Sequence, residues 1–363
     1  MIDLYLRPTA FVESPQRHDG AAVRLAGTML WFSHIEVIDR TGAGTVRQLV
    51  DMRRWEEFLE AIPAEKQARC AQLYTRLTAP RTALQMGERT IRLDQPQVMG
   101  IINMTPDSFS DGGKNADIET AVDAAFAMTS AGAAMIDVGG ESTRPGAPLV
   151  WEGDEISRVE PLIRRLAASG TAISIDTRKA AVMEAAVTAG AAMINDISAL
   201  LFDDRSLEVA KALNVPVVLM HAPSHGTDPH KGGDYDDVVT NVFDWLEERV
   251  EAVEAAGISR DKILVDPGIG FGKSLTDNLS LINNLSVFHG LGCALLFGAS
   301  RKRMIGALSN EAPVEQRLGG SLFLAMKAVE QGAHIIRVHD AAETVQAVQV
   351  WRGLRDAALT ARA

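Results

Sequence analysis

Short apolar runs alternate with longer segments of helical period from about residue 97 almost to the end of the chain. Each run is rich in β-branched or other apolar residues, which predicts a buried strand. The eight predicted strands are Val98–Asn103, Met135–Val138, Ala172–Asp176, Met193–Asp196, Pro216–His221, Ile263–Asp266, Ala294–Phe297 and Ile335–His339. The eight predicted helices are Ile118–Ser130, Glu152–Ala168, Lys179–Thr188, Ser206–Leu213, Tyr235–Ala255, Thr276–Leu285, Pro313–Glu330 and Ala341–Leu354.

Strict alternation of strands and helices predicts βαβ units and a parallel sheet. Eight strands over a span of about 250 residues predict a closed α/β barrel, the (β/α)8 or TIM barrel. We expect this barrel over residues 97–356, followed by a C-terminal tail over 357–363.

Residues 1–96 do not follow the alternation. Met29–Val37 has the pattern of a strand, and Trp55–Leu77 has the pattern of a helix. We therefore expect an N-terminal α+β extension packed on the barrel. No motif within it indicates a function.

The composition and charge of the chain exclude several classes of protein. Hydrophobic residues make up 47% and charged residues 23% of the chain, the balance of a globular protein with a full core. The net charge of −11 argues against a nucleic-acid or anionic-membrane surface, and no apolar run reaches the ~18 residues of a membrane span. The only two cysteines, Cys70 and Cys293, exclude a disulfide scaffold. The N-terminus lacks the pattern of a secretory signal, so we expect a cytoplasmic protein.

Polar residues concentrate where the predicted strands end. In a parallel barrel these ends share one rim, on which active sites form. The residues are Asn103, Asp137, Asp176, Asn195, Asp196, His221, Asp266, Ser300–Lys302, Arg337 and His339. A single Asp or Asn at such a place is equally expected to cap the next helix. Polar groups at all eight ends together predict a shared pocket.

The polar residues of this predicted pocket fall into two chemical groups. Carboxylates and an amide on the second to sixth strands suit the N–H edges of a neutral heterocycle, because a carboxylate accepts two such groups. They are Asp137, Asp176, Asn195 and Asp266. Cations near the seventh and eighth strands and in the second loop suit phosphate oxygens or a carboxylate. They are Lys302, Arg337, His339 and Arg144. Asn103 and Asp107 offer oxygen ligands for Mg²⁺, which completes its shell with phosphate oxygens and water.

Two other patterns carry less weight. Gly268–Ser274 resembles a phosphate-binding P-loop, but Pro267 stands where the first glycine is required. His225 and His230 lie in the fifth loop without a third metal ligand at suitable spacing, so we expect solvated loop histidines.

Six segments at the strand ends resemble one enzyme family, the dihydropteroate synthases of folate biosynthesis. In family order they are Ile101–Gly113, Ile136–Gly146, Ser174–Thr177 with Ile194–Asp196, Asp266–Lys273, Gly298–Lys302 and Arg337–Asp340. The resemblance implies a (β/α)8 barrel and a transferase that uses Mg²⁺. That enzyme joins 4-aminobenzoate to a dihydropterin methyl diphosphate, forming 7,8-dihydropteroate and releasing diphosphate.

The resemblance also implies roles for individual residues. The pterin ring is expected to bind Asp137, Asp176, Asn195, Asp266 and Lys302. The diphosphate is expected at Asn103, Thr143, Arg144, Arg337 and His339, with Asn103 also binding Mg²⁺. The 4-aminobenzoate site is expected at Phe109, Thr143, Pro145 and Ser300. Asp176, Lys302, Arg337 and His339 are the expected catalytic residues.

The family also sets expectations that concern loops and partners. The fifth loop lacks the Gln-Gly turn that relatives usually have after Met220-His221, although the flanking residues are retained. The loop Ser142–Ala147 has no insertion, which predicts ordinary sensitivity to sulfonamides. Family members are usually homodimers, and we expect one here.

Two alternatives share the pterin pocket. One is a methyltransferase that passes a methyl group from a methylated folate to a corrinoid protein, and it has no reason to keep the anion site with Lys302 and Arg337. The other is a non-catalytic pterin-binding relative, which would be expected to lose Asn103, Arg337 or His339. None of the three is lost.

Overall fold

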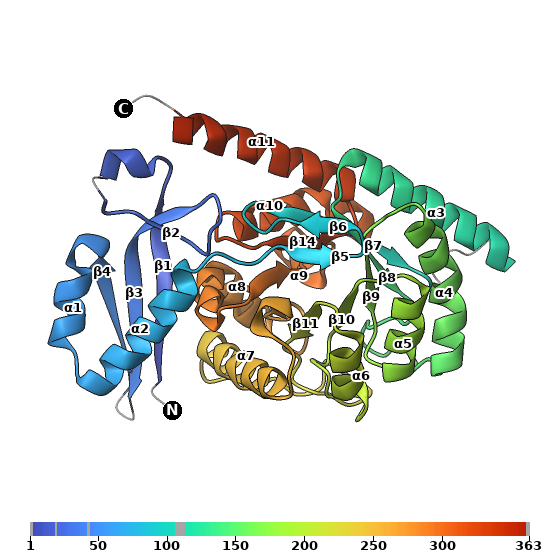
Figure 1. The fold of residues 1–363 in the computed structure, drawn as a ribbon, viewed down its shortest axis with the longest axis horizontal. Coiled ribbons are helices and arrows are strands. Elements are labelled where there is room, and N and C mark those ends of the chain that lie inside the picture. The colour runs from blue at the N-terminus through green and yellow to red at the C-terminus, as the bar shows by residue number, and fades with distance from the viewer. Residues whose placement is uncertain (1–2, 19, 42–43, 106–112, 361–363) are drawn as a thin grey trace.

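Eight parallel strands close into a barrel, as the alternation predicts (Figure 1). The computed structural model describes residues 3–18, 20–41, 44–105 and 113–360. Around the barrel the strands follow the order β10-β11-β12-β13-β14-β7-β8-β9. Their bounds are β7 Gln97–Asn103, β8 Met135–Gly139, β9 Ile173–Asp176, β10 Met193–Asp196, β11 Val217–Met220, β12 Ile263–Asp266, β13 Ala294–Phe297 and β14 Ile335–Val338.

Helices surround the barrel on its outside. They are α3 Gly113–Ala131, α4 Glu152–Ala168, α5 Ala180–Ala189, α6 Ser206–Leu213, α7 Val238–Ala255, α8 Leu275–Asn283, α9 Arg303–Leu308, α10 Leu318–Val329 and α11 Ala341–Thr360. Short 3-10 turns are η1 Pro15–His18, η2 Met52–Arg54, η4 Arg260–Lys262, η5 Leu285–Leu291 and η6 Val314–Gln316. Helix α8 begins at a capping box, in which Ser274 and Asp277 each accept a backbone N–H of the other.

The seventh helical region differs from its prediction. The sequence predicts one helix over 313–330, whereas the structure has η6 and α10 there and a further helix, α9, before them. Between α9 and η6 the residues Asn310 and Glu311 take positive φ angles of 53° and 55°. The Arg317 side chain donates to the carbonyl oxygens of Ala312 and Arg301, which stabilises the turn instead of a continuous helix.

The N-terminal region is an antiparallel sheet with two helices. Strand β3 Trp31–Thr41 pairs with β1 Leu4–Val12, and on its other edge with β2 Val23–Arg24 and β4 Gly44–Asp51. The single helix predicted over 55–77 is two helices, α1 Trp55–Ala61 and α2 Ala64–Thr78. Pro63 explains the break, because proline lacks a backbone N–H and disfavours helical geometry in the residue before it.

Ion pairs and apolar side chains attach this region to the barrel. The fully buried Tyr5 donates its hydroxyl to Asp244 of α7 at 2.7 Å. Glu247, also on α7, accepts from Arg69 at 2.6 and 2.8 Å and from Arg76 at 2.6 Å. In Figure 1 the blue sheet lies beside the barrel, and the red helix α11 runs across both. One continuous apolar core includes residues of both parts.

A short hairpin closes the N-terminal end of the barrel. Its strands are β5 Leu84–Met86 and β6 Arg89–Ile91, and its apolar side chains pack on inward-facing residues of the barrel strands. Just before the hairpin, half-buried Arg81 donates to four backbone carbonyls, including those of His289 at 3.0 Å and Cys293 at 2.9 Å. This end of the barrel is therefore filled by the chain itself.

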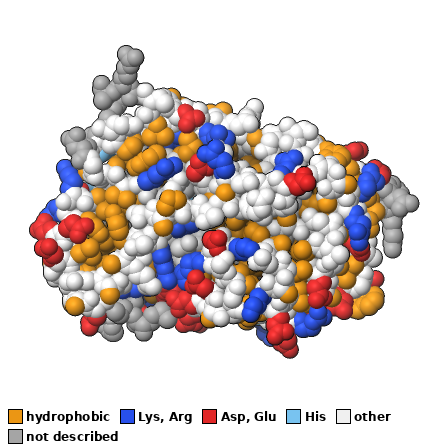
Figure 2. Space-filling model, viewed as in Figure 1, with side chains coloured by type: hydrophobic (Ala, Val, Ile, Leu, Met, Phe, Trp, Pro, Cys, Tyr) orange, Lys and Arg blue, Asp and Glu red, His pale blue; other side chains and the backbone are white. Residues whose placement is uncertain are grey.

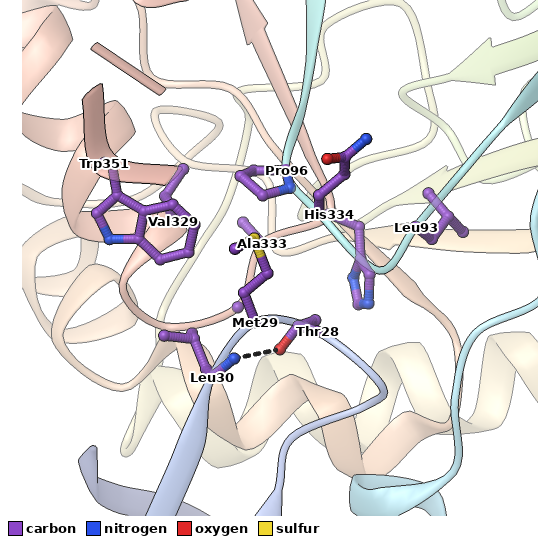
Figure 3. Close-up of a pocket in the computed structure, with 11 residues that line it drawn as sticks. Thr28, Met29, Leu30, Leu93, Pro96, Val329, Ala333, His334 and Trp351 are labelled. Carbon is purple, nitrogen blue, oxygen red and sulfur yellow. Dashed lines mark hydrogen bonds between the residues drawn. The ribbon is translucent and has the colours of Figure 1, made fainter. Parts of the chain in front are cut away.

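The cavity drawn in Figure 3 lies at this closed end. It is lined by residues that precede β3, β7 and β14 and by a residue of α11, among them Met29, Pro96, His334 and Trp351. Its volume is about 10 Å³, which suits at most a single water molecule. A larger groove, of about 540 Å³, separates β1 from α11. Neither cavity lies at the carboxyl ends of the barrel strands.

The surface carries charges of both signs. On the face shown in Figure 2, acidic and basic side chains are interspersed, without a continuous basic surface. Within the described residues, no helix combines the length and the apolar character needed to cross a membrane.

Candidate active site

Arg337 of β14 joins two carboxylates at the carboxyl ends of the strands. Its Nε lies 2.6 Å from Oδ2 of Asp137, and its Nη2 lies 2.6 Å from Oδ2 of Asp176. Asn195 donates its amide to the same oxygen of Asp137 at 3.1 Å. The sequence assigns the carboxylates and the arginine to two different substrate groups, and the structure places them in direct contact.

Burial and charge act against each other in this group. Burial raises the pKa of Asp176 to about 7, although the Arg337 guanidinium opposes the rise. Burial lowers the pKa of Arg337, but Asp137 and Asp176 more than offset this and hold it above its ordinary value. Asp137 is fully buried, and its Oδ1 has no hydrogen-bond partner among the described residues. That oxygen is available to an N–H group of a ligand.

A second carboxylate–amine pair follows β12 and β13. Burial raises the pKa of Asp266, while nearby Lys302 lowers it. Burial lowers the pKa of Lys302 to about 8, against the effect of Asp266. The Lys302 amine donates to the carbonyl of Ile269 and lies 4.8 Å from the centre of the Phe271 ring. Gly268 donates its backbone N–H to Asp266 at 2.7 Å, so the β12–α8 loop (residues 267–274) orients this carboxylate.

His339 and Ser300 meet at the ends of β14 and β13. The Ser300 hydroxyl lies 3.1 Å from Nδ1 of His339 and accepts the backbone N–H of His339 at 3.2 Å. Burial, together with Arg337, Arg301 and Arg144, lowers the pKa of His339 to about 4, against the effect of Asp340. The imidazole is therefore neutral at pH 7 and surrounded by positive charge, which suits an anion.

Asn103 ends β7 on the same rim. A Cβ atom added at Gly139 would lie 3.4 Å from Oδ1 of Asn103 and 3.8 Å from Oδ2 of Asp176. Both distances are ordinary van der Waals contacts, so the two side chains lie close to Gly139. The Asn103 oxygen and the Asp176 carboxylate therefore lie next to the same residue of β8.

The β8–α4 loop (residues 140–151) contains Thr143, Arg144 and Pro145. Arg144 and Pro145 are exposed, and Thr143 is half-buried. The β11–α7 loop (residues 221–237) lies against it: Nε2 of His230 is 2.9 Å from the Thr143 carbonyl oxygen. The prediction of solvated His225 and His230 is therefore wrong, because both rings are half-buried, with His230 stacked on Phe271 and His225 on Trp245.

A buried ionic cluster supports the base of the β8–α4 loop. The Lys179 amine contacts Glu141 at 2.9 Å and Glu155 at 2.5 Å, and Thr177 donates to Glu155 at 2.7 Å. Glu141 also accepts the backbone N–H of Val150 at 3.1 Å, so it bridges both ends of the loop. The sequence pattern did not indicate this cluster, although Glu141 and Thr177 lie within two of the segments that resemble the family.

Lys273 is a further residue that the sequence argument left without a role. Its amine donates to the carbonyls of Gly268 at 2.9 Å and Phe271 at 3.2 Å and lies 3.0 Å from Nδ1 of His221. Burial lowers the pKa of Lys273 to about 7, and burial lowers that of His221 to about 2. Lys273 therefore shapes the β12–α8 loop that carries Asp266. Of the predicted site residues, Phe109 lies outside the described part of the chain, as does Asp107.

The barrel and this rim define an enzyme site that pairs carboxylates with cations for a donor-rich, anionic small molecule. The chain belongs to the family of pterin-binding enzymes: the family model described as "Pterin binding enzyme" matches residues 99–339.

Its relatives are dihydropteroate synthases. The Escherichia coli K12 enzyme is 47% identical over 262 residues, which cover 72% of this chain and 92% of that protein. The Bacillus subtilis enzyme is 44% identical over 260 residues, 71% of this chain and 86% of that protein. The resemblance seen in the six segments is thus confirmed.

Solved structures agree. The Xanthomonas albilineans dihydropteroate synthase with 4-aminobenzoic acid matches with a TM-score of 0.72 and 46% identity, covering 76% of this chain and 98% of that one. The same enzyme in complex with 7,8-dihydropteroate gives a TM-score of 0.69 and 44% identity, over 75% and 98%. The Yersinia pestis enzyme in a sulfonamide drug complex gives 0.71 and 44%, over 76% and 100%. The predicted (β/α)8 fold is confirmed.

Proposed function

We infer that the chain is a dihydropteroate synthase. It is a transferase that condenses (7,8-dihydropterin-6-yl)methyl diphosphate with 4-aminobenzoate and forms 7,8-dihydropteroate and diphosphate. One observation carries this inference most directly. Asp137 and Asp176 contact Arg337 at the barrel rim, and Asn195 donates to Asp137, with Asp266 and Lys302 close by. Such a site can hold both the N–H edges of a pterin and the charge of a diphosphate.

The pterin ring is proposed to lie among the carboxylates. Asp176 and Asp266 would accept its N–H groups, Asn195 would donate and accept, and Lys302 would donate to a ring acceptor. The unpartnered Oδ1 of Asp137 supplies one further acceptor. Four of these side chains lie on different strands, and Lys302 follows β13 directly before α9, so the rigid barrel fixes their spacing.

The diphosphate is proposed to lie on the side of Arg337 and His339. Arg337 has a fork of N–H donors that matches phosphate oxygens, and neutral His339 can donate from its ring. Thr143 and exposed Arg144 of the β8–α4 loop would close over the diphosphate. Beyond it, Pro145, Ser300 and Phe109 would shape the 4-aminobenzoate site.

Mg²⁺ fits the donor set. Asn103 offers an amide oxygen at the rim, and Mg²⁺ takes few protein ligands when phosphate oxygens and water are present. The described residues contain no cluster of three His, Cys, Asp or Glu that would form a separate all-protein cage. When bound, Mg²⁺ would neutralise charge on the leaving diphosphate.

The proposed reaction breaks the bond between the methylene carbon and the diphosphate oxygen. Arg337 and His339 stabilise the departing negative charge. The carbon left behind carries positive charge that the pterin delocalises, and the buried carboxylates of Asp176 and Asp266 stabilise it electrostatically. The amine of 4-aminobenzoate then forms the new carbon–nitrogen bond, and its proton passes to diphosphate or water.

The methyltransferase alternative is not supported, because the relatives are dihydropteroate synthases and the anion-binding residues are all present. A homodimer is proposed for the active protein. Exposed apolar side chains gather on the adjacent helices α10 and α11 and on α9, including Phe323 at 70%, Leu354 at 68% and Leu308 at 56% exposure. Exposed apolar side chains on neighbouring helices are typical of a protein interface.

The test is diphosphate release by the purified protein given the dihydropterin diphosphate, 4-aminobenzoate and Mg²⁺, with each component omitted in turn. Release that requires all three, with 7,8-dihydropteroate as product, is the expected result. Release without 4-aminobenzoate would contradict the proposed nucleophile. Absence of release despite tight pterin binding would refute the proposed function, and methyl transfer from a methylated folate to a corrinoid protein would then be tested.

A further inference from the structure

His230 is the one side chain of the β11–α7 loop with a recorded contact to the β8–α4 loop within the described residues. The imidazole Nε2 lies 2.9 Å from the carbonyl oxygen of Thr143. A carbonyl oxygen only accepts, so Nε2 must carry a proton and donate.

A stack of side chains fixes the direction of this donor. The His230 ring lies flat on Phe271, with 4.8 Å between ring centres and 7° between planes. The Lys302 amine lies 4.8 Å from the centre of the same Phe271 ring. The contacts thus connect the β8–α4 loop, through His230 and Phe271, to a lysine of the pterin pocket.

The rest of the β11–α7 loop is anchored well enough to support His230. Arg178 donates to the carbonyls of Gly226 at 2.9 Å and Thr227 at 3.2 Å. At Gly233, where φ is +93°, an added Cβ would lie 1.8 Å from the carbonyl oxygen of Gly272. The loop backbone is therefore packed closely on the β12–α8 loop and leaves no space for a side chain at this position.

We propose that His230 is a positioning residue that sets the affinity for 4-aminobenzoate by holding the β8–α4 loop over the site. This rests on the proposed function, because it takes that loop to bind the arylamine. The Thr143 carbonyl belongs to the residue directly before Arg144 and Pro145. Fixing this carbonyl reduces the freedom of the loop before the substrate arrives, which favours binding.

Two substitutions separate the hydrogen bond from the stack. His230→Phe keeps an aromatic ring on Phe271 but has no donor for Thr143. His230→Gln keeps an N–H donor but loses the ring. His225→Ala is the matched control, because His225 lies in the same loop and stacks on Trp245 of α7 at 5.4 Å.

The measurement is steady-state kinetics with 4-aminobenzoate varied at saturating dihydropterin diphosphate and Mg²⁺. His230→Phe is expected to raise KM for 4-aminobenzoate roughly 2- to 12-fold, the equivalent of one neutral hydrogen bond, with kcat within about twofold. His230→Gln is expected to restore most of the wild-type KM. His225→Ala is expected to match the wild type.

The outcomes distinguish the two proposals. If the wild type releases no diphosphate, the proposed function fails. If the wild type is active but His230→Phe leaves KM unchanged, or lowers kcat alone, the positioning role is refuted. A His230→Gln enzyme as impaired as His230→Phe would also refute it. Thermal melting of each variant, with its midpoint compared with that of the wild type, identifies any loss that comes from unfolding.

Discussion

Asp176→Asn tests how the buried carboxylate acts in the reaction. The substitution keeps the shape of the side chain and removes its charge, which in the structure lies 2.6 Å from Arg337. A carboxylate about 5 Å from the developing positive charge, at an effective dielectric constant of about 20, contributes roughly 3 kcal/mol. We therefore expect kcat to fall roughly 100- to 300-fold.

Ground-state binding is expected to change less. The asparagine can still accept a hydrogen bond from the pterin ring, and Asp137 still pairs with Arg337 at 2.6 Å. KM for the dihydropterin diphosphate should therefore rise by less than about tenfold, because the hydrogen bond is kept and only the contribution of its charge, about 1 kcal/mol, is lost. Equal losses in kcat and in pterin affinity would refute the idea that Asp176 acts mainly on the transition state.

The same variant tests the pH dependence of kcat/KM. Burial raises the pKa of Asp176 to about 7, so the carboxylate is protonated below this pH and gains its charge as the pH rises. The kcat/KM of the wild type should therefore fall as the pH is lowered through 7, and Asp176→Asn should lack this acid limb. Asp244→Asn is the control, because burial raises the pKa of Asp244 to about 6 on α7, where it pairs with Tyr5. A wild-type acid limb that survives in Asp176→Asn would refute the assignment.

Three further predictions concern the interfaces and the arylamine site. Glu247→Gln leaves two arginines without their buried partner, which should cost about 3–5 kcal/mol and lower Tm by roughly 4–7 °C in calorimetry without changing kcat. Burial raises the pKa of Glu247, but Arg69 and Arg76 lower it below its ordinary value. The stabilisation by Glu247 is therefore present at neutral pH and lost in acid. A Tm deficit of the variant that is as large at pH 3 as at neutral pH would contradict this. Phe323→Glu should convert a dimer to monomers in sedimentation, and an unchanged mass would contradict the proposed interface. Sulfonamides should inhibit competitively with 4-aminobenzoate, and unimpaired turnover at levels that block typical members would contradict that.

The barrel could be predicted because its information is local. Each strand is a short apolar run and each helix follows within a few residues, so the alternation is visible in the sequence. The rim residues could be predicted for the same reason, since each lies in the carboxyl-terminal part of a strand or just after it. Three contacts at the site could not be predicted, because they join residues far apart in the sequence. Arg337 contacts Asp137 and Asp176 across 200 and 161 residues, and His230 contacts Thr143 across 87.

The N-terminal sheet was harder to predict for a different reason. Strand β4 has six consecutive exposed residues, so it lacks the apolar alternation that marks a half-buried strand. Its pairing with β3 supplies the regular structure instead. The break between α1 and α2 was signalled by Pro63, which the helical pattern around it concealed.

The contacts between the two ends of the chain have a consequence for protein synthesis. Gln16 donates to the carbonyl of Leu359 at 2.8 Å, and Arg355 donates to the carbonyls of Val12 at 3.1 Å and Met29 at 3.0 Å. A ribosome makes the sheet first and α11 last. A nascent chain shorter than about 355 residues therefore lacks these contacts, and one that ends before α7 also leaves Tyr5 without Asp244. The part of the protein that is made first is completed last, and a factor that shields apolar surface on nascent chains should act on it throughout elongation.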